Sequence, residues 1–264
     1  MSNSTIPQIL ALDFDGVLCD GRAEYLESSW RVYTEIWDGS DVDLEALRPR
    51  FYELRSVIET GWEMPLLLRS LHKGVSNAVI RDNWSSLVPE MLKKNNFTQG
   101  EMAQLLDEKR DRWIKTNPDD WLAHHEFYPG IIARLGEIIR HKPLKIYIIT
   151  TKEGRFVRKL LNQQGITFPP HQIIGKEIQQ PKHQTLTDLQ QQNNNASVWF
   201  VEDRLKTLLS VATVPTLNSV RLFLATWGYN TARSRQQAQE HPHIKLLTLP
   251  QFNQDISQWT DDSL

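Results

Sequence analysis

The apolar residues of this chain follow two different periods. Short apolar runs bounded by polar segments occur near the N-terminus and again in the second half of the sequence. Runs of this kind are typical of buried β-strands. They span residues 9–12, 144–150, 198–202 and 220–226, with shorter candidates at 172–174 and 244–247. Helical patterns separate the later runs, at 155–164 and 184–191, and strands that alternate with helices predict a parallel sheet.

Between residues 21 and 126 the apolar period is that of helices. Four aromatic or aliphatic residues at i, i+4, i+7 and i+11 fall on one face of a helix. These residues are Leu26, Trp30, Tyr33 and Trp37. Further helical patterns cover residues 44–58, 75–92 and 101–115, and no strand pattern is evident in this part of the chain.

Together the two periods predict an α/β fold, namely a Rossmann-like parallel sheet core with an all-helical domain inserted after the first strand. Residues 1–20 carry the first strand and the loop that follows it, and residues 21–126 form the helical insertion. Residues 127–264 complete the α/β core. The chain re-enters the core near Tyr128-Pro129-Gly130, a turn signal ahead of another helix.

Charge and cysteine content bear on the partners and the cellular compartment of the protein. The 30 basic and 32 acidic residues give a formal net charge of -2, so neither nucleic acid nor an anionic membrane is expected as a partner. The single cysteine, Cys19, rules out an intramolecular disulfide and fits a reducing compartment. No apolar stretch approaches the roughly 20 residues of a membrane-spanning helix, and the N-terminal segment lacks the apolar core of a signal peptide. We therefore expect a soluble, cytoplasmic protein.

The first candidate for chemistry is Asp13-Phe14-Asp15-Gly16, directly after the first strand. Carboxylates at i and i+2 on a strand end point to the same side. Like charges at about 4 Å cost on the order of 4 kcal/mol at an effective dielectric of 20, so a cation, a proton or solvent must offset them. Gly16 lets the backbone turn sharply and approach a ligand. An acidic loop that merely ends a strand is the alternative interpretation.

A second acidic pair, Glu202-Asp203, follows the strand at residues 198–202. Ligands of open α/β sheets bind at the carboxyl ends of the strands. If this strand neighbours the first one, four carboxylates converge, and such oxygen-rich clusters suit Mg²⁺. Alone, the pair would more often be exposed acids at a helix start.

Two weaker signals come from a hydroxyl pair and a lysine. Thr150 ends a predicted strand and Thr151 follows it ahead of a helix, where backbone amides and a hydroxyl form an anion site. Thr is also a common N-cap. Lys182 opens a further helix, where a cation opposes the helix dipole unless an anion lies in front of it. Lys176 is the rival candidate for the same role.

In this order the motifs resemble those of the haloacid dehalogenase-like (HAD) superfamily: an Asp-x-Asp-Gly strand end, a strand ending in Thr, a Lys, and a late acidic pair. The resemblance spans residues 9 to about 252. The segment 220–229 is similar to the last core strand and loop of phosphoglycolate-phosphatase-like members, and the helical insertion resembles the cap of that branch. Many relatives read Lys-Pro-x-Pro, whereas here Pro181 precedes Lys182 and no second Pro follows.

The resemblance implies a Mg²⁺-dependent phosphatase that acts on a small phosphorylated metabolite through an aspartyl-phosphate. It makes Asp13 the nucleophile and Asp15 the general acid and base. The implied Mg²⁺ ligands are Asp13, the backbone carbonyl of Asp15, Asp203 and, directly or through water, Glu202. The implied phosphate contacts are Thr150, Thr151, Lys182 and the amides near Gly16.

Three alternatives share parts of this chemistry. A phosphomutase would pass the phosphoryl group to a sugar instead of water. A receiver-type signalling module also uses paired acids, Mg²⁺, Thr and Lys, but it has no place for a helical insertion after the first strand. A catalytically weak phosphate-binding protein would retain the fold, although every core side-chain type is present here.

Overall fold

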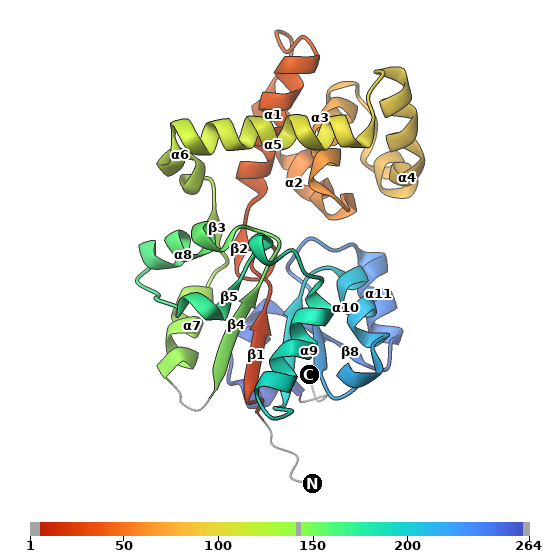
Figure 1. Cartoon of the computed structure of the whole chain (residues 1–264). Coiled ribbons are helices and arrows are strands. Elements are labelled where there is room, and N and C mark those ends of the chain that lie inside the picture. The colour runs from red at the N-terminus through yellow and green to blue at the C-terminus, as the bar shows by residue number, and fades with distance from the viewer. Residues whose placement is uncertain (1–5, 141–143, 261–264) are drawn as a thin grey trace. The chain divides into compact units, whose positions relative to one another are not determined.

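A computed structural model describes residues 6–140 and 144–260 of the 264-residue chain (Figure 1). The parts of the predicted core at residues 1–5, 141–143 and 261–264 lie outside the described residues.

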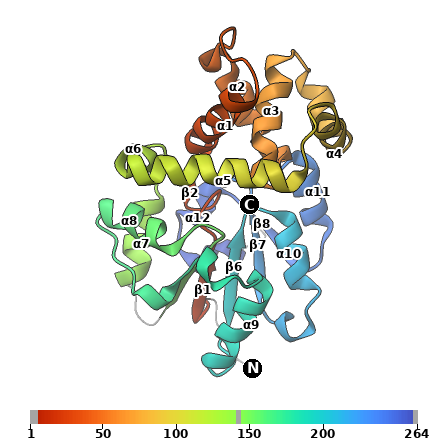
Figure 2. The same cartoon turned by 45° about the horizontal axis from the view of Figure 1, so that its top comes forward.

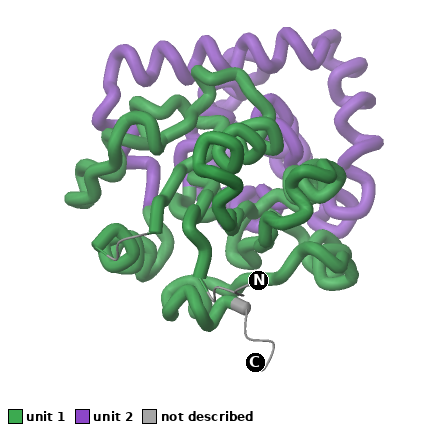
Figure 3. The backbone as a smooth tube through the Cα atoms, turned by 60° about the horizontal axis from the view of Figure 1, so that its bottom comes forward, with its two compact units in different colours: residues 1–20, 127–264 green, residues 21–126 purple. Residues whose placement is uncertain are grey.

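The chain divides into two compact units (Figure 3). One unit comprises residues 1–20 and 127–264, and the other comprises residues 21–126. The first unit has an α/β architecture with a β-sheet, and the second unit is built mainly from helices.

The α/β unit is organised around a six-stranded sheet in which each neighbouring pair of strands is parallel. The strand order is β5-β4-β1-β6-β7-β8. Each predicted apolar run contains one of these strands, so the prediction of an α/β fold with a parallel sheet is confirmed. The strands are β1 (Ile9–Leu12), β4 (Lys145–Ile149), β5 (Ile173–Ile174), β6 (Val198–Glu202), β7 (Arg221–Ala225) and β8 (Ile244–Leu247).

The register of β1 places the ends of three strands at the same level. Leu12, the last residue of β1, pairs with Ile148 of β4 and with Val201 of β6. Because all three strands run in the same direction, the loops that follow them emerge side by side at the carboxyl edge of the sheet.

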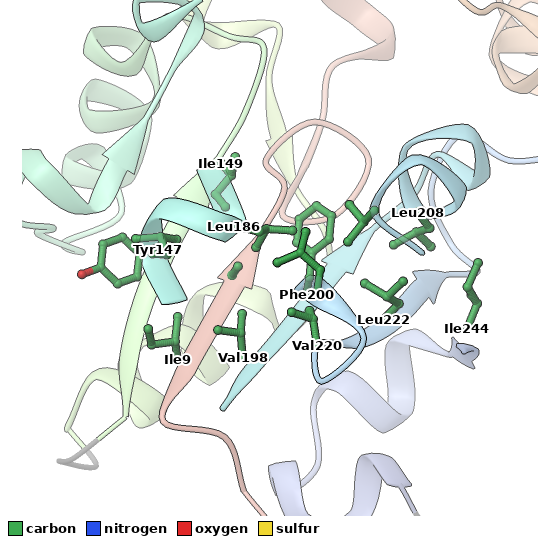
Figure 4. Packing of buried hydrophobic residues seen from close by; sticks show 14 of the residues in the cluster. Ile9, Tyr147, Ile149, Leu186, Val198, Phe200, Leu208, Val220, Leu222 and Ile244 are labelled. Carbon is green, nitrogen blue, oxygen red and sulfur yellow. The ribbon is translucent and has the colours of Figure 1, made fainter. Parts of the chain in front are cut away.

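Helices cover the sheet because its strands are apolar on both faces. Ile9, Val198 and Phe200 point to one face and pack against Leu186 and Leu208 from the helices (Figure 4). Side chains alternate along a strand, so Leu10 and Leu12 point to the opposite face, where they too are fully buried. Continuous apolar runs are the expected signature of strands buried on both sides.

The helices of this unit lie between strands in sequence, as the alternating pattern predicts, except for a short one that follows the last strand (Figure 2). They are α7 (Ile131–Arg140), α8 (Gly154–Gln163), α9 (Lys182–Gln192), α10 (Leu205–Ala212), α11 (Ala232–Glu240) and α12 (Leu249–Phe252). Short 3-10 helices include η4 (Lys176–Ile178), which precedes α9. Within the described part of the chain, no helix has both the length and the hydrophobicity of a membrane span.

The second unit consists mainly of helices. They are α1 (Arg22–Ile36), α2 (Leu44–Leu54), α3 (Met64–His72), α4 (Asn77–Lys94), α5 (Gln99–Thr116) and α6 (Pro118–Ala123). Helix α1 contacts α3 and α5, and an ion pair joins Arg110 of α5 to the buried Glu24 of α1 at 2.7 Å. The apolar pattern missed the two-residue strands β2 (Cys19–Asp20) and β3 (Glu126–Phe127), which form a two-stranded sheet.

Candidate active site

Three acidic side chains meet where β1 and β6 end. Asp13 follows β1, Glu202 is the last residue of β6, and Asp203 comes next in the chain. The Asp13 amide donates to the carbonyl of Val201 at 3.0 Å, which extends the pairing of the two strands to the first acid. One carboxylate oxygen from each acid lies within 4.8 Å of the others, and all three side chains are buried. Three of the four carboxylates expected to converge at neighbouring strands are therefore together, whereas Asp15 is not part of this group and pairs with a lysine of another loop.

Gly16 allows the loop after β1 to approach Asp203. Its φ of 88° lies in the left-handed region, and a Cβ at this position would stand 2.2 Å from Asp203 Oδ2. Its amide donates to the carbonyl of Cys19 at 2.8 Å. Because Gly16 has no side chain, the loop can lie this close to Asp203. The Gly16 N–H is already hydrogen-bonded within the loop. Two residues earlier, the Phe14 amide donates a hydrogen bond to Asp13 Oδ1 at 2.7 Å.

Asp203 is fixed by the loop that follows β7. The amide of Tyr229 donates to Asp203 Oδ2 at 2.6 Å, and Asn230 Nδ2 donates to the Asp203 carbonyl at 3.2 Å. A Cβ on Gly228 would lie 2.3 Å from Asp203 Cβ. Sequence reasoning assigned no role to these three residues, although they lie at or just beyond the end of the segment 220–229 that resembles a core strand and loop of known members.

The structure brings Lys182, and not Lys176, to the acids. Lys182 begins α9, and its Nζ lies 2.8 Å from Asp13 Oδ1 and 2.6 Å from Glu202 Oε2. Buried carboxylates in front of the helix thus offset the unfavourable position of a cation at its N-terminus. Lys176 lies in η4, where its side chain is exposed.

Burial governs the electrostatics of the cluster. It raises the pKa of Asp13 to about 8, with repulsion from Glu202 acting in the same direction and Lys182 opposing both. Burial is also the largest cause of the raised pKa of Glu202 and of Asp203. Burial would lower the pKa of Lys182, but the charges of Asp13 and Glu202 outweigh it and the net shift is upward.

This charge balance fits a divalent cation. The raised pKa values show that ionising all three carboxylates is unfavourable even though the Lys182 ammonium contacts two of them, and a divalent cation would offset that excess of negative charge. Mg²⁺ binds through hard oxygen ligands and often through one or two carboxylates plus water and phosphate. The three buried carboxylates therefore offer oxygen ligands of the kind that this ion binds.

A pH dependence of stability follows for the metal-free protein. The raised pKa of Asp13 means that the native state holds a proton that the unfolded chain, with a pKa of 3.8, has lost. We therefore expect the free energy of unfolding to fall as the pH rises from about 4 to about 8, by up to about 1.4 kcal/mol per pH unit for this group. Urea unfolding in EDTA across this range measures the slope. An Asp13→Asn variant should show a shallower slope, and an unchanged slope would contradict the assignment to Asp13.

The loop after β4 contributes a hydroxyl and an unexpected lysine. Thr150 is buried, and its Oγ1 accepts a hydrogen bond from the Lys152 amide at 3.1 Å, whereas Thr151 is exposed. Lys152 Nζ lies 3.4 Å from Asp15 Oδ2. Sequence reasoning did not single out Lys152; its only signal was its position two residues after a strand-ending Thr.

Residues 7–212 match the family model of haloacid dehalogenase-like hydrolases, and the chain belongs to this family. No curated protein sequence matches the chain.

Solved structures show the same fold at low sequence identity. A putative haloacid dehalogenase-like hydrolase from Bacteroides fragilis is 17% identical, with a TM-score of 0.56 and coverage of 93% of this chain and 99% of its own. A predicted phosphoglycolate phosphatase from Haemophilus somnus is 13% identical, with a TM-score of 0.56 and coverage of 97% of both chains. The Protein Tyrosine Kinase A (PtkA) of Mycobacterium tuberculosis is 15% identical, with a TM-score of 0.54 and coverage of 94% and 97%. Proteins with such different names share the fold, so the reaction must be argued from the site.

Proposed function

We propose that this protein is a Mg²⁺-dependent phosphatase that hydrolyses a small phosphorylated metabolite through an aspartyl-phosphate on Asp13. One observation carries the proposal. The Asp13 carboxylate is buried beside Glu202 and Asp203 with the Lys182 ammonium at 2.8 Å, and a second acid follows it at position 15. The proposed site therefore combines three groups: a nucleophilic carboxylate, a cation for the phosphoryl oxygens and a candidate proton donor.

In the first half-reaction a carboxylate oxygen of Asp13 attacks phosphorus, and the bond from phosphorus to the leaving oxygen breaks. Asp15, in its protonated form, gives its proton to that oxygen. The hydrogen bonds from Lys182 and from the Phe14 amide to Asp13 Oδ1 fix the plane of the attacking carboxylate. Such fixed orientation lowers the entropic part of the barrier.

In the second half-reaction water attacks the aspartyl-phosphate. Asp15, now a carboxylate, takes the proton of the attacking water, and the bond between phosphorus and Asp13 breaks to release inorganic phosphate. Thr150, Thr151 and Lys182 serve as contacts for the phosphoryl oxygens, together with the backbone near Gly16. Donors that face the developing charge stabilise the transition state of such transfers.

Residues at the carboxyl ends of β1 and β6 would hold the metal. The ligands would be Asp13, the backbone carbonyl of Asp15 and Asp203, with support from Glu202. When bound, Mg²⁺ reduces the repulsion between the carboxylate nucleophile and the phosphate. Residues 21–126 would act as a helical cap that selects the substrate, and the cytoplasm is the proposed location.

Metal removal tests the proposal. We expect phosphate release from 4-nitrophenyl phosphate and from a panel of phosphorylated metabolites to fall at least about 100-fold in EDTA and to return with added Mg²⁺. Colorimetric phosphate measurement ranks the substrates at the same time. Undiminished activity in EDTA would exclude the metal-dependent mechanism. Rapid interconversion of sugar phosphates with little release of phosphate would instead support the phosphomutase alternative.

A further inference from the structure

The structure shows an ion pair at the acid that follows the nucleophile. Lys152 Nζ lies 3.4 Å from Asp15 Oδ2, and the two side chains are only 9% and 17% exposed. The contact links the loop after β1 to the loop after β4, which are adjacent because β1 pairs with β4. Partial burial makes this contact stronger than a solvent-exposed pair of the same geometry.

The backbone of Lys152 is held on both sides. Its amide donates to Thr150 Oγ1 at 3.1 Å, and its carbonyl accepts from the Lys176 amide at 3.0 Å. These two hydrogen bonds tie the lysine to the end of β4 and to the segment after β5.

Residues 175–177 brace this loop from the other side. The Gly154 amide donates to Glu177 Oε2 at 3.1 Å. A Cβ on Gly175 would lie 2.4 Å from the Gly154 nitrogen and 2.8 Å from the Lys152 carbonyl oxygen, so glycine permits the close approach. These contacts from residues 175–177 fix the backbone position of Lys152 and therefore the position from which its side chain extends.

The other oxygen of Asp15 has no such contact. Within the described residues, Asp15 Oδ1 is buried and has no hydrogen-bond partner. A buried acceptor without a donor costs about 1–3 kcal/mol, so the site favours a ligand that supplies one. A protonated leaving oxygen or a water molecule is such a donor.

We infer that Lys152 is a positioning residue that holds Asp15 by Oδ2 and thereby assigns proton exchange to Oδ1. The inference rests on the proposed function. In the first half-reaction the proton leaves Oδ1 for the leaving oxygen as the phosphorus–oxygen bond breaks. In the second, Oδ1 takes the proton of the water that attacks phosphorus. Lys152 stays paired with Oδ2 throughout and touches neither phosphorus nor the leaving group.

The dependence on the leaving group tests this role. The ratio kcat/KM reports steps through departure of the leaving group, and 4-nitrophenolate departs with little help from an acid. For Lys152→Met we expect kcat/KM to fall about tenfold or more with glycerol 2-phosphate and less than about threefold with 4-nitrophenyl phosphate. Lys152→Arg should recover part of the loss. Lys206 is an exposed lysine on α10, and Lys206→Met should leave kcat/KM unchanged with both esters. Equal losses on both esters would overturn the inference.

A double variant distinguishes an effect that Lys152 exerts through Asp15 from an unrelated disturbance of the site. If Lys152 acts through Asp15, adding Lys152→Met to Asp15→Asn should lower kcat/KM by less than about twofold further. Additive losses would show that Lys152 acts on something other than Asp15 and would overturn the inference.

A crystallographic comparison gives a readout that needs no activity. In Lys152→Met we expect the Asp15 carboxylate to leave the position it occupies in the wild-type protein. An unchanged Asp15 rotamer would overturn the inference even if the enzyme is a phosphatase. Failure of the wild-type protein to hydrolyse any ester would count against the proposed function, while the Asp15 rotamer would still decide the positioning role.

Discussion

Asp13→Asn is expected to abolish phosphate release, with turnover lowered by at least about 10⁴-fold. An amide oxygen is a poor nucleophile and cannot form the aspartyl-phosphate, whereas the shape of the side chain is preserved. The measurement is phosphate release from 4-nitrophenyl phosphate and the best metabolite of the panel, together with the search for a phosphorylated protein by intact mass.

This variant should remain folded, which makes the loss of activity interpretable. The pKa of Asp13 is raised to about 8, so removing its charge relieves repulsion in the cluster instead of creating it. The amide oxygen of the substituted side chain can still accept the hydrogen bond from Lys182, which retains Glu202 as a partner at 2.6 Å. Thermal unfolding at or above the wild-type temperature would document the fold. Full activity in this folded variant would refute the proposed nucleophile.

Lys182→Met should have the second largest effect, lowering kcat/KM on the order of 10²- to 10³-fold. The variant removes the cation that contacts both Asp13 and Glu202, at 2.8 and 2.6 Å, and that would meet the phosphoryl oxygens. Two buried carboxylates then lose their shared partner, so metal-free stability at about pH 8 should also fall by a few kcal/mol. Kinetics in saturating Mg²⁺ and urea unfolding in EDTA measure the two effects separately.

Lys176→Met is the matched control, because both lysines lie between β5 and the body of α9 and both fitted the motif. Lys176 is exposed in η4, so this variant should retain activity within about twofold. If instead the loss occurred in Lys176→Met and not in Lys182→Met, the segment between β5 and α9 would have to adopt a different conformation during catalysis.

The sequence alone determined the class of fold because its strands are buried on both faces. A strand such as residues 9–12 has no polar face to interrupt the apolar run, and a parallel sheet requires helices between its strands. The periods of the pattern therefore specified the order of strands and helices. They did not specify β2 and β3, whose two-residue length leaves no period to detect.

The sequence also indicated which acids could meet if the strands before them were neighbours, since the carboxyl ends of neighbouring parallel strands lie together, but it counted Asp15 among them and the structure does not. Asp13, Glu202 and Asp203 each follow or end an apolar run, and the register of Leu12 with Val201 brings them within reach of one ion. The assignment of chemical roles to these residues came from the family resemblance and stays a prediction.

Only the tertiary structure decided the contacts made by loops. The choice of Lys182 over Lys176 depends on where α9 begins relative to β6, and the clamp of Tyr229 and Asn230 on Asp203 depends on the path after β7. The pairing of Lys152 with Asp15 depends on the brace from residues 175–177. Loop conformations follow from hydrogen bonds between segments distant in the chain, and no periodic pattern along the sequence records such bonds.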